Sequence, residues 1–291
     1  MNLGFVGLGI MGRPMALHLL KGGHAMRVYA RRPQSMTPLT DAGATACATP
    51  AEAARGVEVV FTMVSDTPDV EQVVLGPGGT VEGAAAGCVV VDMSTISPVA
   101  TRAMAAKLAD RHRDARCARF RRRYRRHQRH LSIMAGGKPE VFARVLPLFE
   151  LMGKNIVHIG ANGAGQVAKG CNQIVGAVTL EAVAEAMTLA RKNGVDPARV
   201  RDALLGGFAW SRVLEVHGGR MLSRDFKPGF KAGLHRKDLR IVVDTAAQLD
   251  IALPQSALIA QHLNALVGMG CGEEDSAAVV KVIENLSGIE V

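Results

Sequence analysis

Short apolar runs separated by helical patterns fill the first half of the chain. The runs cover Leu3–Val6, Ala25–Ala30, Val57–Val64 and Cys88–Met93. Continuous apolar runs of this length indicate strands buried on both faces, as in a parallel sheet that is covered by helices. We therefore predict an α/β domain with a parallel sheet in this half.

The second half of the chain has helical spacing throughout. A long pattern from Gly165 to Asn193 is apolar nearly all round, so we expect this helix to be buried between two domains. Further segments have helical spacing, and none alternates like a strand. They are Pro197–Leu205, Ser211–Leu222, Ala232–Leu249, Pro254–Val267 and Glu274–Leu286. We predict two domains, residues 1–162 and 163–291, of which the second is all-helical.

A glycine motif directly follows the first predicted strand and precedes a helical pattern. It consists of Gly7, Leu8, Gly9, Ile10, Met11 and Gly12, with the spacing GxGxxG. In such a unit Gly7 permits the tight turn, Gly9 permits close approach of a pyrophosphate, and Gly12 permits packing of helix on strand. The helix N-terminus then faces the phosphates. The motif predicts a Rossmann-type dinucleotide-binding domain, and a glycine turn in another α/β protein is the alternative.

The residues after the second predicted strand indicate which dinucleotide is bound. An acid at this place binds the ribose 2′-hydroxyl of NAD, whereas an arginine accommodates the 2′-phosphate of NADP. This chain has Ala30, Arg31 and Arg32, with no acid. Two guanidinium groups can hold a phosphate by paired hydrogen bonds. We favour NADP(H), while NAD(H) and a merely solvated basic turn stay open.

Polar residues follow two further predicted strands. Ligands of an open α/β sheet lie beyond the carboxyl ends of its strands. We therefore expect Met63, Val64 and Ser65 after one strand, and Ser94 and Thr95 after the next, to face the cofactor. Capping of the helix that starts near Pro98 is the alternative role of the two hydroxyl groups.

Composition excludes several classes of protein. No stretch of eighteen uninterrupted apolar residues occurs, and the N-terminus is a predicted strand without a charged leader, so we expect neither a membrane span nor a signal peptide. The cysteines are scattered, without the spacing of metal ligands, so we expect reduced thiols, no metal and a cytoplasmic location. They are Cys47, Cys88, Cys117, Cys171 and Cys271.

Four segments in order resemble the β-hydroxyacid dehydrogenase family. They are GFVGLGIMGRPMA, VVDMSTISP, GAGQVAKGCNQ and FKPGFKAGLHRKDL. The resemblance implies a Rossmann-type N-terminal domain, a long helix and an all-helical C-terminal domain in a homodimer or homotetramer. It also implies an NAD(P)-dependent oxidoreductase of a small hydroxy or oxo acid. The last segment and the residues near Gly206 favour reduction of tartronate semialdehyde to glycerate, with 3-hydroxyisobutyrate or a related acid as the alternative.

The third segment carries the catalytic candidates. Lys169, Asn172 and Gln173 lie at i, i+3 and i+4 and share one helix face. The resemblance implies that Lys169 is the catalytic residue and that Asn172 touches the substrate. We expect Gln173, on the same face, to contact the substrate as well. Hydride delivery to an aldehyde makes an alkoxide, which a lysine ammonium can stabilise and protonate. A lysine that extends from a helix into solvent is the alternative.

Two further segments contribute candidates through the resemblance. The matching lysine of the family, here Lys237, reaches the cofactor or substrate, and an ordinary surface pair with Asp238 is the alternative. Phe208 and Trp210 lie in a segment that faces the cleft in relatives. Core packing is an equally good explanation for Trp210, the single tryptophan of the chain.

The positive charge of the chain is concentrated in one arginine block. Residues Arg111 to His130 contain ten arginines and one acid, so their removal cancels the formal net charge of +9. Taken alone, the block indicates an arm that binds nucleic acid, with Phe120 and Tyr124 between the arginines. We favour another interpretation and expect no nucleic-acid partner.

The family has a substrate-carboxylate loop of the form D-A-P-V-S-G-G at this place, which the chain lacks. If the arginines use CGN codons, reading one base later from Arg116 permits D-A-P-V-S-G-G, and reading so from Arg129 permits Gly-Thr before Leu131. We interpret the arginine block as a compensated frameshift. We expect it to pack badly where a core strand belongs and to leave a poor enzyme or an inactive, cofactor-binding relative. We assign no substrate residues within it.

Overall fold

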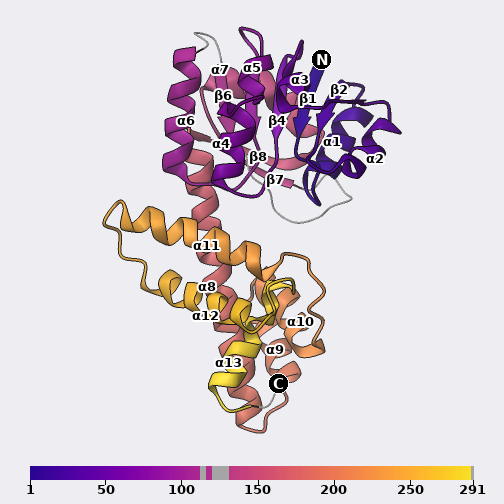
Figure 1. Ribbon diagram of the computed structural model, residues 1–291. Coiled ribbons are helices and arrows are strands. Elements are labelled where there is room, and N and C mark those ends of the chain that lie inside the picture. The colour runs from indigo at the N-terminus through magenta and orange to yellow at the C-terminus, as the bar shows by residue number, and fades with distance from the viewer. Residues whose placement is uncertain (112–115, 120–130, 290–291) are drawn as a thin grey trace. The chain divides into compact units, whose positions relative to one another are not determined.

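The apolar runs of the first half form the strands of one sheet (Figure 1). The computed structural model describes residues 1–111, 116–119 and 131–289, and within these residues the sheet has eight strands in the order β3-β2-β1-β4-β5-β6-β7-β8. They are β1 (Asn2–Val6), β2 (Ala25–Tyr29), β3 (Thr45–Ala46), β4 (Val59–Thr62), β5 (Val89–Asp92), β6 (Arg116–Arg119), β7 (Leu131–Gly136) and β8 (Gly153–Gly160). The predicted α/β fold is confirmed, since the first six strands have the Rossmann order.

Neighbouring strands of this sheet run parallel, apart from the antiparallel pair β6 and β7. The predicted strands extend one or two residues too far, to Ala30, Val64 and Met93, because these apolar residues already belong to the exit turns. The register joins β1 to β4 from Leu3↔Val59 to Val6↔Thr62. It thereby brings the ends of the two strands to the same edge of the sheet.

Helices cover both faces of the sheet. One face packs on α1, α2 and α7, and the other packs on α3, α4, α5 and α6. The bounds are α1 (Gly12–Lys21), a 3₁₀ turn (Pro33–Ser35), α2 (Thr37–Thr40), α3 (Pro50–Ala54), α4 (Thr67–Leu75), α5 (Thr80–Gly83), α6 (Pro98–Arg111) and α7 (Pro139–Glu150). Local signals set several starts, as where the Thr49 hydroxyl accepts from the Glu52 N–H ahead of Pro50.

The alternation of side chains explains the apolar runs. Phe61 and Val59 of β4 belong to the core on one face, while Val60 between them belongs to the core on the other. The Phe5 and Phe61 rings stack with centroids 5.8 Å apart. Both faces of the sheet are therefore shielded from water, so the strands lack the alternating polar residues that a solvent-exposed face would have.

Strand β6 lies inside the sheet, between β5 and β7. Its register with β5 runs from Val89↔Arg116 to Asp92↔Arg119. The expectation that the arginine block loses a core strand is wrong for the backbone of Arg116–Arg119, because main-chain pairing does not depend on the side chains. The expectation of bad packing concerns the side chains of residues 111–130, which lie outside what the structure describes.

The chain divides into two compact units, Met1–Lys169 and Gly170–Val291. The division lies inside helix α8 (Ala164–Lys192), which is continuous. The later elements are α9 (Pro197–Leu205), a π-helical turn (Leu214–Gly218), α10 (Gly219–Ser223), α11 (Ala232–Ala247), α12 (Pro254–Gly268), a 3₁₀ turn (Ser276–Val279) and α13 (Val280–Leu286). The helical second half is confirmed, while the predicted boundary at residues 162 and 163 stays a prediction.

Two predicted helices of unit 2 are interrupted. The segment Ser211–Leu222 contains the π-helical turn, which ends at Gly218 beside a second glycine, and glycine has a low helix propensity. The predicted helix from Glu274 begins later as a 3₁₀ turn, because the Asp275 carboxylate accepts from the Ala277 N–H and caps it there. Both differences are local and leave the helical class unchanged.

Helix α8 is not buried on every side within this chain. Val175 and Leu189 are 68% and 67% exposed, and the predicted burial of α8 between two domains stays a prediction. By length and composition alone α8 could cross a membrane, but half of its most apolar window is buried inside the structure. A core helix passes the same test.

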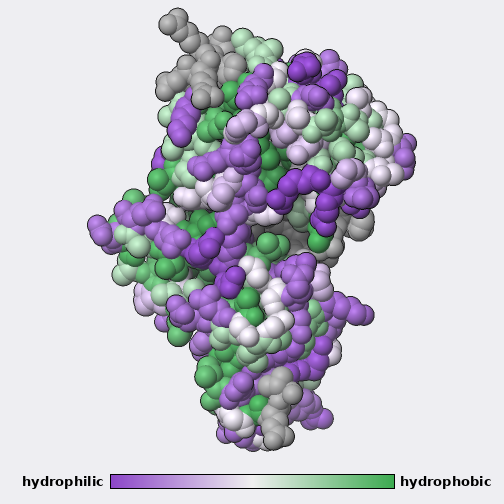
Figure 2. All heavy atoms as spheres, in the orientation of Figure 1, coloured by the Kyte–Doolittle hydropathy of each residue, from purple (hydrophilic) through white to green (hydrophobic). Residues whose placement is uncertain are grey.

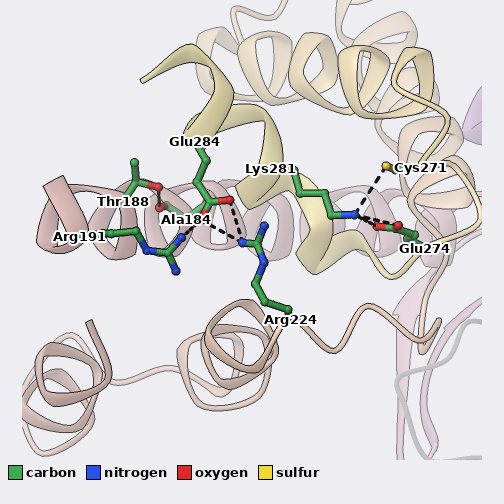
Figure 3. A network of polar contacts seen from close by, with 8 residues as sticks. All are labelled: Ala184, Thr188, Arg191, Arg224, Cys271, Glu274, Lys281 and Glu284. Carbon is green, nitrogen blue, oxygen red and sulfur yellow. Dashed lines mark hydrogen bonds and ion pairs between the residues drawn. The ribbon is translucent and has the colours of Figure 1, made fainter. Parts of the chain in front are cut away.

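Ion pairs fix the last helices of unit 2 (Figure 3). The buried Glu284 carboxylate accepts from Arg191 at 2.5 Å and from Arg224 at 2.8 and 3.0 Å. Lys281 lies 2.7 Å from Glu274 and 3.8 Å from the Cys271 sulfur.

Figure 2 shows hydrophobic surface near the turn between α11 and α12, where Leu249 is 53% exposed.

Candidate functional site

Two glycines of the GxGxxG motif are required by the fold itself. Gly7 has a φ of +96°, and its N–H donates to the Tyr29 carbonyl at 2.9 Å. A Cβ atom on Gly7 would lie 2.3 Å from the Met63 carbonyl oxygen, and one on Gly12 would lie 1.9 Å from the Gly7 carbonyl oxygen. Side chains at either position would force the strand, the turn and helix α1 apart.

Gly9 differs, because the fold does not need a glycine there. A Cβ atom on Gly9 meets no described atom within 4 Å, and its φ is not in the left-handed region. The neighbouring Leu8 is buried and Ile10 is 56% exposed. The first turn of α1 follows, with no acid and no side-chain cap from Met11. Helix N-termini attract anions, so this open cradle fits a dinucleotide pyrophosphate.

The end of strand β2 presents arginine and no acid. Ala30 is buried, whereas Arg31 and Arg32 are exposed. The Arg31 Nη1 atom lies 3.8 Å from an Asp69 Oδ1 atom on the first turn of α4. Sequence reasoning missed Asp69, since nothing in the chain order links it to Arg31. An exposed pair at this distance is weak and leaves the guanidinium able to bind a phosphate.

A buried carboxylate organises the ends of β4 and β5. Asp92 is 1% exposed, and its Oδ1 atom accepts from the Thr62 hydroxyl at 2.8 Å and from the Ser94 hydroxyl at 2.7 Å. The Val64 N–H donates to the Ser94 hydroxyl at 2.9 Å. Ser94 is fully buried, and its hydroxyl ties the two strand ends together. The predicted contact of Ser94 with a cofactor stays a prediction.

The loop after β5 is also held by helix α8. The Gln166 Nε2 atom donates to the Ser94 carbonyl at 2.8 Å, and the Ile96 N–H donates to Gln166 Oε1 at 3.3 Å. Thr95 is half-buried between these two peptide groups. One turn further along α8, Lys169 is 1% exposed, which excludes the alternative of a lysine extended into solvent. The partly buried Met63 and Ser65 lie at the same edge of the sheet.

The candidates of unit 2 meet at a second buried carboxylate. The Asn172 amide donates to the Gln173 Oε1 atom at 3.0 Å, and the Gln173 amide donates to Asp238 Oδ2 at 2.7 Å. Lys237 Nζ lies 3.0 Å from Asp238 Oδ1. Asp238 is 4% exposed, so the alternative of an ordinary surface pair is excluded. Sequence reasoning mentioned Asp238 only as a neighbour of Lys237, and the adjacency was the available signal.

A third buried carboxylate fixes the segment ahead of α11. Asp275 Oδ2 accepts from the Gly229 and Phe230 N–H groups at 2.8 and 2.9 Å and pairs with Arg220 at 2.7 Å. Burial alone would raise the pKa of Asp275, but hydrogen bonds from His217 and from backbone amides outweigh it and hold that pKa well below its usual value. The helix that carries Lys237 thus starts from a fixed point.

Phe208 and Trp210 lie on the surface of unit 2. Phe208 is fully exposed, and Trp210 is 57% exposed. Core packing is therefore excluded as the role of Trp210. Both residues lie in the turn after α9, and their predicted contact with a substrate stays a prediction.

The candidates thus form two clusters, each centred on a buried aspartate. The cluster of unit 1 joins an anion cradle to a hydroxyl loop and a buried lysine. The cluster of unit 2 joins a second lysine to two side-chain amides. Such groups can bind a dinucleotide, hold a carboxylate and transfer a proton.

Family models match nearly the whole chain. Residues 2–160 match the NAD binding domain of 6-phosphogluconate dehydrogenase. Residues 163–283 match the NAD-binding domain of NADP-dependent 3-hydroxyisobutyrate dehydrogenase.

Individual relatives agree with these matches. The 2-hydroxy-3-oxopropionate reductase of Escherichia coli is 44% identical over 98% of this chain and 97% of its own length. The 3-hydroxyisobutyrate dehydrogenase of Pseudomonas aeruginosa is 33% identical over 88% of this chain and 89% of its own length. A structure of Mycobacterium tuberculosis 3-hydroxyisobutyrate dehydrogenase with L-serine matches with a TM-score of 0.89 and 27% identity, covering 97% of this chain and 98% of that one. The chain therefore belongs to the family of NAD(P)-dependent β-hydroxyacid dehydrogenases.

Proposed function

We propose that this protein is an NADPH-dependent reductase of tartronate semialdehyde, with glycerate as product and Lys169 as general acid. The observation that carries the proposal is the complete burial of Lys169, one turn after the glutamine that holds the Thr95 loop. The 44% identity to the reductase of Escherichia coli supports the choice of substrate. A 3-hydroxyisobutyrate dehydrogenase is the alternative within the family.

NADPH supplies the hydride when bound. As hydride reaches the aldehyde carbon, negative charge develops on the carbonyl oxygen. The Lys169 ammonium stabilises this charge and donates a proton to the oxygen, which gives the alcohol. Because Lys169 is 1% exposed, water does not screen this charge, so its effect on the barrier is larger than that of a surface lysine.

The unit 2 cluster supplies groups that suit the substrate carboxylate and hydroxyl. Asp238 fixes the Gln173 amide and the Lys237 ammonium, and Gln173 in turn fixes the Asn172 amide. Side chains held in one geometry bind a small polar acid with less loss of entropy than mobile ones. We assign substrate binding to Asn172 and Lys237.

NADPH is favoured over NADH by the charge after β2. Arg31 offers an exposed guanidinium to the 2′-phosphate, and no acid follows the strand to accept a ribose hydroxyl. Asp69 lies close to Arg31 and reduces its positive potential, so we expect a moderate preference.

Strand β6 bears on the competing nucleic-acid function. Four residues of the arginine block, Arg116–Arg119, form a strand between two others and not a free arm. This strand coincides with D-A-P-V in the shifted frame, in which Ser-Gly-Gly follows directly along the sequence. The coincidence supports the frameshift interpretation. We further propose a cytoplasmic homo-oligomer that binds neither nucleic acid nor membrane.

Two proteins test the proposal, the chain as written and a chain whose arginine block is read one base later. Reduction of tartronate semialdehyde and oxidation of 3-hydroxyisobutyrate are measured for both, with each nicotinamide cofactor. We expect the shifted-frame protein to reduce tartronate semialdehyde fastest, with NADPH, and the chain as written to be at least 100-fold slower (on the order of the effect of losing fixed substrate contacts). Full activity of the chain as written would refute the frameshift interpretation. Faster turnover of 3-hydroxyisobutyrate would show that this acid, and not tartronate semialdehyde, is the substrate.

The role of Lys169 is tested in the active protein. Lys169→Ala should lower kcat by about three orders of magnitude while the affinity for NADPH stays within about threefold. Near-normal turnover of this variant would make Lys169 a structural lysine. Loss of NADPH binding in parallel would assign it to the cofactor.

A further inference from the structure

Gln166 bridges two peptide groups with one side chain. Its Nε2 atom donates to the Ser94 carbonyl at 2.8 Å, and its Oε1 atom accepts from the Ile96 N–H at 3.3 Å. The two bonds bracket Thr95, so the amide pairs with the loop as a neighbouring strand would. Gln166 is 3% exposed, and water does not compete for these bonds.

The same loop is fixed from its other side by the sheet. The Ser94 hydroxyl donates to Asp92 at 2.7 Å and accepts from the Val64 N–H at 2.9 Å. Strands β4 and β5 thus hold one side of the Thr95 loop, and helix α8 holds the other. The Thr95 loop is left with little freedom to shift along the sheet edge.

The start of α8 is itself packed closely. A Cβ atom on Gly136 of β7 would lie 2.8 Å from the Gly165 nitrogen. Gly163 has a φ of +90°, and a Cβ atom there would lie 3.2 Å from the Pro98 carbonyl oxygen. The first turn of α8 therefore rests on β7 and α6, and Gln166 projects from a fixed base.

Lys169 follows Gln166 by three residues and lies on the same face of the helix. We propose that Gln166 is a positioning residue, which fixes the distance between Thr95 and Lys169 by clamping the peptide groups around Thr95. This inference rests on the proposed function. Gln166 acts through the positions of Thr95 and Lys169 and does not itself touch the reacting atoms.

The chemistry of the clamp requires glutamine. One planar amide supplies a donor and an acceptor side by side, which matches a carbonyl and an N–H two residues apart. An ionised glutamate cannot donate to the Ser94 carbonyl, and a leucine can make neither bond. Gln166→Leu keeps the size of the side chain and removes both bonds, and Gln166→Glu removes only the donor.

The matched control is Thr188→Val. Thr188 is also buried on α8, and its hydroxyl donates to the Ala184 carbonyl at 2.8 Å within the helix, far along the chain from Lys169. This variant removes a buried hydrogen bond from the same helix without touching the Thr95 loop. It measures what a purely structural loss does to exchange, binding and turnover.

The first readout is amide hydrogen exchange at Ile96, which needs no turnover and is made on the chain as written. We expect exchange about five- to tenfold faster in Gln166→Leu than in the unchanged protein, since a net hydrogen bond is lost. Thr188→Val should leave Ile96 unchanged. Equal exchange in Gln166→Leu and the unchanged protein would overturn the clamp.

The second readout separates positioning from stability in the shifted-frame protein. Gln166→Leu should lower kcat by about 10- to 100-fold while NADPH affinity stays within about threefold, because misplacement affects reaction geometry more than binding. Gln166→Glu should fall between this variant and the unchanged protein. A loss of kcat no larger than that of Thr188→Val would refute the proposal. Inactivity of the unchanged protein would refute the proposed function and leave the exchange result to decide the clamp.

Discussion

The two units build their candidate sites by different means. In unit 1 the main chain forms the cradle at Gly7–Gly12, and close approach of backbone atoms excludes a side chain at Gly7 and at Gly12. In unit 2 the candidates are placed by side chains around buried carboxylates, Asp238 and Asp275. A side chain added at a close-packed glycine of the backbone site forces the main chain apart. Removal of a buried carboxylate from the side-chain site leaves its partners without a counter-charge or an acceptor. Substitutions at the two kinds of position should therefore fail in different ways.

The sharpest test of the backbone site is Gly12→Val. A Cβ atom here would lie 1.9 Å from the Gly7 carbonyl, so the turn cannot close, and we expect a loss of at least about 4 kcal/mol of unfolding free energy. Urea denaturation or recovery of folded protein measures it. The control is Gly23→Ala, where φ is +84° but the space is open, with an expected cost of about 1 kcal/mol. Similar losses in both variants would contradict the close-approach argument.

The equivalent test in unit 2 is Asp275→Ala. It leaves the Arg220 guanidinium beside a buried void, and removal of one partner of a buried ion pair costs about 3–5 kcal/mol. The exposed capping carboxylate Asp196 gives the control, because Asp196→Ala should cost only about 1 kcal/mol. Both are compared by urea denaturation. If the two variants were equally stable, Asp275 would not be the fixed point that we describe.

Gly9→Ala separates cofactor binding from folding, because Gly9 belongs to the backbone site but is not required by the fold. The unfolding free energy should change by less than about 0.5 kcal/mol, because the Cβ atom meets nothing. Affinity for NADPH should fall about tenfold, since the methyl group occupies the cradle. Tm and fluorescence titration measure the two effects. Unchanged affinity for NADPH would show that the pyrophosphate does not bind at Gly9.

Acid pH gives the smallest effect. The pKa of Asp275 is lowered in the folded state, so its stabilisation is complete above the unfolded pKa of about 3.9 and is lost as pH falls below it. We expect a loss on the order of 1 kcal/mol between about pH 5 and pH 3. Burial raises the pKa of Glu181, which opposes this trend. The comparison is therefore made with Asp275→Asn, which should lose less stability over the same range. If the unfolding free energy fell equally with pH in both proteins, Asp275 would not be the cause of the fall.

The fold could be predicted largely because burial on both faces removes polar residues from the strands. Val59, Val60 and Phe61 are apolar in succession for this reason. The π-helical turn and the late start at Ser276 could not be predicted, because they depend on Gly218 and on the cap from Asp275 and not on periodicity.

The candidate site was predictable where chemistry is tied to a fixed spacing. The glycine motif and the Lys169 segment are of this kind. Gln166 and Asp92 escaped notice, and Asp238 was named only as a neighbour of Lys237, because each is an ordinary polar residue of its strand or helix until the fold buries it. Ser94 and Thr95 are adjacent and chemically alike, and only the register of β4 with β5 turns Ser94 into the sheet.

The strand order also bears on synthesis at the ribosome. β1 emerges first, β2 and β3 add on one side of it, and β4 to β8 then add one after another on the other side. None of the eight described strands has to insert between two that are already paired, so this sheet grows at its free edges, in the order of translation. A fault confined to β6 thus arrives after β1 to β5 have joined. The nascent chain then already holds the complete glycine cradle, whatever happens to the strands that follow.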